Sequence, residues 1–128
     1  MPESSHYQND LRRRTKQFAL AILDLCSLIP NNLKGQILSK QLVRSGTSVG
    51  ANYREACRAK SNADFISKIE TILQELEETA YWLELLDEGN ILPSSEIISS
   101  LSNETNQLIA IFVTIVKGVK ERQKIKIE

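Results

Sequence analysis

The sequence predicts an all-α protein that folds as an up-down-up-down antiparallel four-helix bundle. Only three prolines and five glycines interrupt its 128 residues, which favours long helices over a many-stranded sheet. Apolar residues recur at three- and four-residue spacing, the period of one helix face, over four separate segments. The connections between these segments are short, and short connections place long neighbouring helices antiparallel. A chain of this length is expected to form one domain, residues 1–128.

The first two helices are expected at about residues 8–29 and 33–59. The apolar face of the first consists of Phe18, Ile22, Leu25 and Ile29. Asn9 or Asp10 is expected to cap its start, and Pro30 with the two asparagines that follow ends it. The second helix contains the stretch RSGTSVGANYREA, residues 44–56.

The third and fourth helices are expected at about residues 61–88 and 93–122. The third begins with a polar cap and an acid in the first turn, and Gly89 suits the left-handed position after its end. Its apolar face consists of Phe65, Ile69, Ile72, Leu76, Thr79 and Leu83. The fourth opens at Pro93 and carries Ile97, Leu101, Leu108, Phe112 and Val119. The charged tail KERQKIKIE is expected to fray.

Two of these helices have more apolar surface than one core requires. FALAILDLCSLI has ten apolar residues of twelve, and LIAIFVTIV has eight of nine, whereas a helix facing one core needs three or four per two turns. The excess predicts contact with a second copy of the chain; the alternative is a helix pair buried at the bundle centre. The β-branched run in QLIAIFVTIVKGV could form a strand instead of a helix, but a lone strand would lack a partner.

The glycines of RSGTSVGANYREA do not match a phosphate-binding loop. A Walker loop needs four residues between its glycines followed by Gly-Lys-Ser/Thr, whereas three residues separate Gly46 from Gly50. Four-residue spacing instead stacks both glycines on one helix face, and with Ala51 they are predicted to permit close packing of another helix. The alternative is a kink or a break near Gly46.

Polar residues form a second stripe beside these glycines. On the second helix it consists of Arg44, Ser45, Ser48, Asn52 and Glu55, and on the third of Lys68, Glu75 and Glu78. If the two helices run antiparallel about the 59–61 turn, residues whose numbers sum to about 120 face each other. Asn52 and Glu55 are then expected near Lys68, and Arg44 near Glu75 or Glu78. The alternative is a solvated face without pairs.

The charges are divided into blocks although the formal net charge is zero. Residues 1–60 carry ten Lys/Arg against four Asp/Glu, residues 61–116 one against ten, and the last twelve five against two. If the protein binds RNA or DNA, the expected contact surface is Arg12, Arg13, Arg14, Lys16, Lys34, Lys40, Arg54, Arg58 and Lys60. The alternative is a solvated surface, or pairing of these cations with the acidic third helix.

The residues that most catalytic sites require are scarce. The single histidine, His6, lies in an expected loose N-terminus, so neither Glu-x-x-His metal pairs nor Cys-His catalysis is predicted. Glu75, Glu77 and Glu78 are interpreted as a solvated acidic face rather than a cation site. No cofactor, metal or small-molecule substrate is expected. Cys26 and Cys57 lack metal-ligand spacing and are expected to be reduced. The segment RRRTKQFALAILDLC resembles an export signal, but Asp24 interrupts it, and a cytoplasmic location is predicted without a membrane span.

The stretch Gln41–Leu86, preceded by TKQFALAI, resembles the small four-helix-bundle proteins encoded in intervening sequences of bacterial large-subunit (23S) ribosomal RNA genes. RSGTSVGANYREA followed by DFISK and ETAYWL carries the resemblance, which covers about residues 12–88. It implies a homo-oligomer, a pentameric ring or barrel, with no assigned biochemical activity. It also implies distant similarity to accessory proteins of diversity-generating retroelements, whose basic barrel surface binds nucleic acid and the polymerase. The family's motif positions here are Arg44, Ser45, Gly46, Ser48, Asn52, Arg54, Glu55, Lys68, Glu75 and Glu78.

Two classes of function are therefore expected. The first is a non-enzymatic, self-assembling scaffold that binds nucleic acid or a nucleoprotein partner through its basic surface. The second is a small-ligand-binding or enzymatic bundle that uses Arg44, Asn52, Glu55 and Lys68. A cavity lined by these four side chains would favour the second class, and their engagement in mutual pairs would favour the first.

Overall fold

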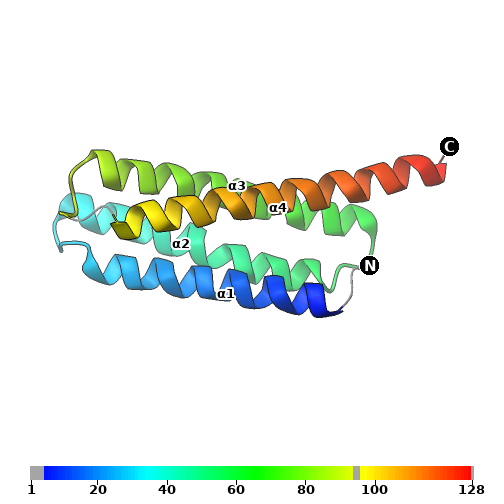
Figure 1. The fold of residues 1–128 in the computed structure, drawn as a ribbon, viewed down its shortest axis with the longest axis horizontal. Coiled ribbons are helices and arrows are strands. Elements are labelled where there is room, and N and C mark those ends of the chain that lie inside the picture. The colour runs from blue at the N-terminus through cyan, green and yellow to red at the C-terminus, as the bar shows by residue number, and fades with distance from the viewer. Residues whose placement is uncertain (1–4, 94–95, 128) are drawn as a thin grey trace.

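A computed structural model describes residues 5–93 and 96–127, which form four helices and no strand. The helices are α1 (Ser5–Leu28), α2 (Leu33–Ala56), α3 (Asn62–Glu88) and α4 (Glu96–Ile127). They lie side by side along one long axis, with the α1–α2 and α3–α4 connections at one end and the α2–α3 connection at the other (Figure 1). The all-α prediction is confirmed, and the chain has the fold of a four-helix bundle.

The boundaries of three helices differ from those expected. The first helix starts at Ser5, so neither Asn9 nor Asp10 caps it, and His6 belongs to the helix rather than to a loose N-terminus. The second ends at Ala56, three residues early. The fourth starts at Glu96 and continues to Ile127; of the expected start, Pro93 precedes the helix and residues 94–95 lie outside the described part. The fraying expected for the tail is wrong, because residues 119–127 contain no glycine or proline and several good helix formers.

Side-chain caps fix the starts of α2 and α3. Asn32 Oδ1 accepts a hydrogen bond from the Gly35 amide at 2.9 Å, and Ser61 Oγ accepts one from the Asp64 amide at 3.0 Å. At the end of α3 the expected left-handed glycine is not found. Gly89 keeps a φ of −79°, and Asn90 takes the left-handed conformation with a φ of 52°. Asparagine accepts this conformation more readily than other residues with a side chain, because its short polar group bonds locally.

The core runs the length of the bundle between all four helices. Its largest fully buried side chains are Phe18, Ile22, Leu25, Leu42, Val49, Ile69, Ile72, Leu76, Leu83, Leu86, Leu108 and Phe112. Four hydroxyl residues, Thr15, Ser45, Thr79 and Thr105, are buried with them. The Tyr53 ring meets Phe112 edge to face at a centroid distance of 5.6 Å.

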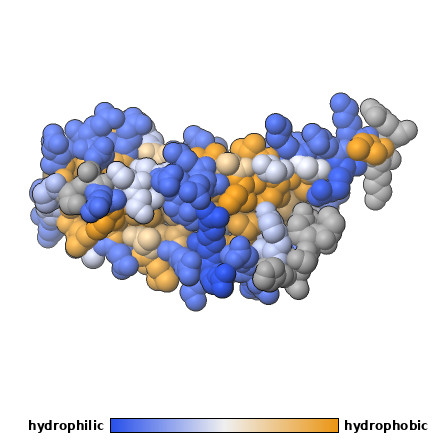
Figure 2. Space-filling view, viewed as in Figure 1, coloured by the Kyte–Doolittle hydropathy of each residue, from blue (hydrophilic) through white to orange (hydrophobic). Residues whose placement is uncertain are grey.

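The excess apolar residues of the first and fourth helices lie at the surface. Leu20, Leu23 and Leu28 of α1 are exposed, as are Ile97 and Val113 of α4. Apolar side chains gather over the middle of α4 (Figure 2). Burial of a helix pair at the bundle centre therefore does not account for all the excess apolar residues. Within the described residues, no helix combines the length and apolarity needed to cross a membrane.

Candidate functional site

Gly46 and Gly50 of α2 lie against α1. A Cβ atom at Gly46 would lie 2.8 Å from Ile22 Cγ1, and one at Gly50 would lie 3.3 Å from Thr15 Oγ1. The α2 helix continues through both without a break. Ala51, by contrast, is exposed. Its predicted part in close packing is wrong, because one residue along a helix turns the side chain by about 100° and away from α1.

Ion pairs join α2 to α3 along their shared surface. Arg44 Nη1 lies 3.1 Å from Glu75 Oε2, and Arg44 Nη2 contacts Glu78 Oε1. At one end of the same surface, Lys68 Nζ forms an ion pair with Glu55 Oε1 at 3.0 Å. Burial lowers the pKa of Arg44, but attraction to Glu75 and Glu78 outweighs it, so the pKa is raised. The hydrogen bond from Lys68 to Glu55, and the attraction between their charges, raises the Lys68 pKa. These contacts follow the pairing that antiparallel numbering predicts.

Hydroxyl and amide groups fill the rest of this surface. Ser45 Oγ and Thr79 Oγ1 share a buried hydrogen bond of 2.7 Å. Ser48 Oγ donates to the Ser45 carbonyl, and Asn52 Nδ2 donates to the Ser48 carbonyl. Asn52, expected near Lys68, directs its amide hydrogen bond to its own helix, and the ion pair of Lys68 is with Glu55.

The hollows described on the molecule are lined by residues other than those of this polar surface. Three hollows on the described part of the molecule lie between α1 and α4, between α3 and α4, and along α3 at residues 67–74. None of them is lined by Arg44, Asn52, Glu55 or Lys68. Among the described residues, no three His, Cys, Asp or Glu side chains gather closely enough to hold a metal ion.

The nine basic residues expected to bind nucleic acid do not form one surface. Lys34 lies in the first turn of α2 and Arg54 in its last, about 30 Å apart at 1.5 Å per residue. Lys40 lies closer to Lys34 than to Arg54. Arg14 is occupied, because its guanidinium forms two hydrogen bonds of 2.8 Å with Glu104. The Glu104 hydrogen bond raises the pKa of Arg14, against a smaller opposing effect of burial.

The remaining basic residues come together at one end of the α1–α2 seam. Because Gly50 faces Thr15 and the chain reverses between the helices, Arg12 lies at the level of Arg54. We call Arg12, Arg54, Arg58 and Lys60 the basic patch. Within the described structure none of these four side chains forms an ion pair. Lys16 is exposed one turn along α1, and Arg13 beside it pairs with Asp10.

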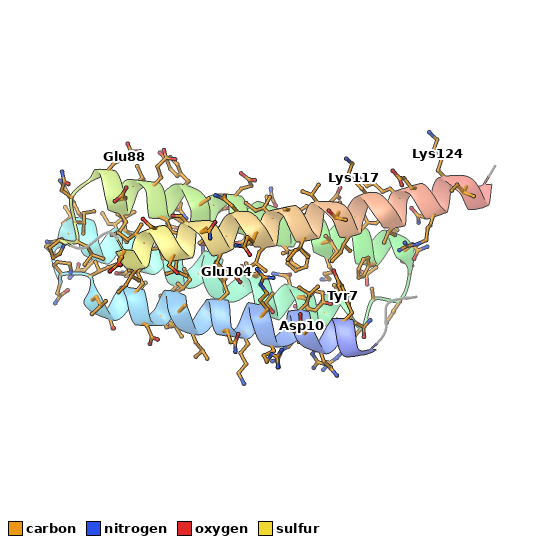
Figure 3. All side chains as sticks on the ribbon, in the orientation of Figure 1. Tyr7, Asp10, Glu88, Glu104, Lys117 and Lys124 are labelled. Atoms are coloured by element: carbon orange, nitrogen blue, oxygen red, sulfur yellow. The ribbon has the colours of Figure 1, made fainter. Side chains whose placement is uncertain are left out.

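A further group of cations lies on α4 and was not among the expected contact residues. Lys117, Lys120 and Lys124 follow spacings of three and four, so an intact helix carries them on one side. Lys117 and Lys124 project outward on the same side of α4 (Figure 3). Lys120 pairs with Glu70 of α3 at 3.0 Å. Lys117 and Lys120 lay within the expected helix, and only Lys124 lay beyond its expected end.

The bundle is therefore polarised along its axis. Residues 7–15, 50–74 and 104–125, which share one end, carry eleven Lys/Arg against six Asp/Glu, a formal charge of +5. Residues 16–49, 75–93 and 96–103 carry four against eight, a formal charge of −4. Glu88 lies at the acidic end and Lys124 at the basic end (Figure 3). The basic patch thus lies at the positively charged end of the bundle.

Comparisons with known proteins agree with this fold and its motif. A crystal structure of a protein of unknown function from the S23 ribosomal protein family, from Bacteroides thetaiotaomicron, is 39% identical to this chain. The match covers 86% of this chain and 97% of the other, with a TM-score of 0.79. No curated protein matches the sequence. The family model of the 23S rRNA-intervening sequence proteins matches residues 8–114, which ends before the lysines of α4. This match confirms the family that RSGTSVGANYREA predicts, and the chain belongs to the 23S rRNA-intervening sequence proteins.

Proposed function

We propose that this protein is a non-enzymatic, self-assembling helical scaffold of the cytoplasm that binds nucleic acid phosphates through its basic patch. The observation that carries the proposal is the division of the cations into two kinds. Arg14, Arg44 and Lys68 are held by carboxylates of neighbouring helices. The patch cations at the positive end of the bundle are without such partners in the described structure.

Unpaired cations at a positive surface attract the phosphate backbone without reading bases. Arginine and lysine side chains supply the contacts, and each phosphate that they neutralise releases condensed counterions. The proposed binding is therefore independent of sequence and sensitive to salt.

The assembly is proposed as a ring of antiparallel bundles. In the contacts between successive helices, residue numbers rise along one helix as they fall along the next. Thr15 with Gly50 and Ser45 with Thr79 fit this order, which supports the up-down-up-down topology. The exposed Leu20 and Leu23 support self-association. The number five rests on the family resemblance.

The alternative, a ligand-binding or enzymatic bundle, finds less support. Arg44 and Lys68 are engaged by glutamates, and Asn52 bonds within its own helix. A site for substrate would need these groups to face an open cavity. Their mutual pairing instead favours a role in joining α2 to α3.

The proposal is tested by measuring binding to a fluorescent RNA hairpin, and to the DNA duplex of the same sequence, at 50 and 200 mM salt. Wild type is expected to bind both, with affinity falling steeply between the two salt concentrations. Arg58→Gln is expected to lower affinity and to reduce the slope of log K against log salt by about 0.9, the value for one lost phosphate contact. Arg54→Gln with Arg58→Gln doubles this change.

The matched control is Lys34→Gln, which removes one positive charge from the other end of α2. It is expected to leave affinity and salt slope unchanged. Equal losses from Lys34→Gln and Arg58→Gln would indicate a diffuse charge effect and would contradict the patch. No binding by wild type at 50 mM salt would overturn the nucleic-acid role altogether.

A further inference from the structure

A groove of about 810 Å³ runs between α1 and α4. Its floor is apolar and includes Phe18, Ala21 and Leu101, with the exposed Ile97 at its edge. The Arg14–Glu104 pair crosses it at one end, with both nitrogen–oxygen distances at 2.8 Å. The α1 and α4 helices approach each other less closely than the other neighbouring pairs, so core side chains lie at the base of an open channel. A second apolar surface would exclude water from this channel.

Carboxylates mark both ends of the groove. Glu104 lies at the end with Arg14, and Asp24 and Glu96 line the other end. Glu104 and Glu96 are eight residues apart on one helix, about 12 Å at 1.5 Å per residue. Among the described contacts, the side chains of Asp24 and Glu96 form no ion pair. The groove therefore suits an apolar ridge with one cation beside the unpaired Asp24 and Glu96, and a second that joins the Arg14–Glu104 pair at the other end.

The same chain presents such a ridge on the exposed face of α1, beside the groove. Leu20 and Leu23 of α1 are 51% and 42% exposed, with Lys16 exposed one turn before Leu20. Cys26 Sγ of α1 lies 3.8 Å from the Ser39 carbonyl oxygen of α2, so Cys26 and Ser39 lie at the same height along the bundle axis. Lys40, the residue after Ser39, therefore lies at the other end of these leucines. We call Lys16, Leu20, Leu23 and Lys40 the α1 ridge. Lys16 and the level of Lys40 are nine residues apart along α1, about 14 Å.

We infer that the α1 ridge of one copy seats in the α1–α4 groove of the next, an assignment that rests on the self-assembly proposed above. The leucines cover the groove floor, and the two lysines meet the carboxylates at its ends. The separations of about 14 Å between lysines and about 12 Å between glutamates are compatible, since each long side chain adapts by several ångströms. The apolar area and the charges therefore agree in the same register.

The contact is heterologous, because ridge and groove are different surfaces of one chain. Each copy in the chain of contacts uses its ridge on one neighbour and its groove on another. Such contacts generate a closed ring when the rotation between copies closes, and a filament when it does not. The basic patch takes no part in the contact, so assembly leaves its phosphate-binding groups available.

The test uses two complementary sets of variants at exposed positions. The ridge variant is Leu20→Glu with Leu23→Glu, and the groove variant is Ile97→Glu with Ser100→Glu. Light scattering is expected to show an oligomer for wild type and a monomer for each variant alone. The ridge variant changes no groove-lining residue, and the groove variant changes no ridge residue. An equimolar mixture is therefore expected to form a 1:1 dimer and nothing larger.

A control variant, Leu33→Glu with Ile37→Glu, places the same charges on exposed apolar residues of α2 outside both surfaces. It is expected to keep the wild-type mass. Circular dichroism checks that each variant retains its helices, and Lys16→Glu with Lys40→Glu, both exposed, serves as a second ridge variant if the first unfolds. An oligomeric wild type whose folded variants keep its mass, or a mixture that stays monomeric, would overturn the ridge and groove assignment. A monomeric wild type would overturn the proposed self-assembly as well.

Discussion

Ser45 Oγ and Thr79 Oγ1 form a hydrogen bond of 2.7 Å in the core between α2 and α3, where both residues are fully buried. Thr79 has a second partner, because its hydroxyl also lies 2.8 Å from the Glu75 carbonyl oxygen of its own helix. The two residues thus fix α2 against α3 at one level without charge.

The Ser45–Thr79 bond predicts an asymmetric response to mutation. Ser45→Ala leaves the Thr79 hydroxyl bonded to Glu75 and is expected to cost about 0.5–1.5 kcal/mol of unfolding free energy, the net value of one hydrogen bond. Thr79→Val strands the buried Ser45 hydroxyl and is expected to cost about 1–3 kcal/mol. The double variant is expected to cost less than the sum. Urea unfolding of all four proteins measures this, and additive losses would show that the two hydroxyls do not interact.

The close approach of α2 to α1 predicts that Gly46→Ala destabilises the protein. Alanine gains up to about 1 kcal/mol of helix propensity, but its Cβ would lie 2.8 Å from the fully buried Ile22 side chain. Overpacking of this kind costs about 1–3 kcal/mol. A net loss of unfolding free energy is therefore expected in urea titrations.

Two other glycines provide matched controls. At Gly50 the new Cβ meets Thr15 at 3.3 Å, so the loss is expected to be smaller than at Gly46. At Gly118 the nearest atom is a terminal nitrogen of Arg122 at 3.5 Å, and Gly118→Ala is expected to stabilise. A Gly46→Ala protein as stable as the Gly118→Ala protein would contradict close packing at Gly46.

The Arg44 ion pairs predict a small, salt-dependent coupling between α2 and α3. Arg44 is half exposed, and exposed pairs contribute about 0.2–1 kcal/mol. In a double-mutant cycle, Arg44→Ala and Glu75→Ala are expected to couple by an amount in this range at low salt and by less at 1 M salt. Losses that simply add at both salt concentrations would mean that the pair contributes nothing to stability.

The helices could be predicted from the sequence because their apolar period is long and regular. The pairing of Arg44 with Glu75 and of Lys68 with Glu55 could be predicted from the short turn between α2 and α3 alone. Asn52 could not be predicted, because an asparagine in a helix chooses between its own backbone and a neighbouring side chain by local geometry. The end of α4 was missed for a related reason: a charged tail resembles a frayed end unless its lysine spacing is weighed.

The groove and the α1 ridge could not be read from periodicity. Both depend on how closely α1 approaches α4, and that distance is set by packing throughout the core rather than by either helix alone. The segment that contains Leu20 and Leu23 was recognised as having excess apolar residues, but Lys40 was grouped with the basic residues of the other end. The contact of Cys26 with Ser39 shows that Lys40 lies near Leu23 in height along the bundle axis.

The Cys26 thiol predicts a dependence of stability on alkaline pH. Burial raises its pKa, against a smaller lowering by a hydrogen bond with the Ser39 side chain. A raised native pKa means that the folded protein holds the thiol proton above the unfolded pKa of about 8.5. The stabilisation is complete below that value and is lost as pH rises toward the native pKa. Cys26→Ala removes this loss, so its unfolding free energy is expected to fall less than that of wild type between pH 8 and 10.

In a Cys57→Ser background, the Cys26 thiol is also expected to react with a disulfide reagent more slowly than an exposed cysteine, with a pH profile shifted upward. Parallel stability curves for wild type and Cys26→Ala, together with the reactivity of an exposed thiol, would show that burial does not protect Cys26.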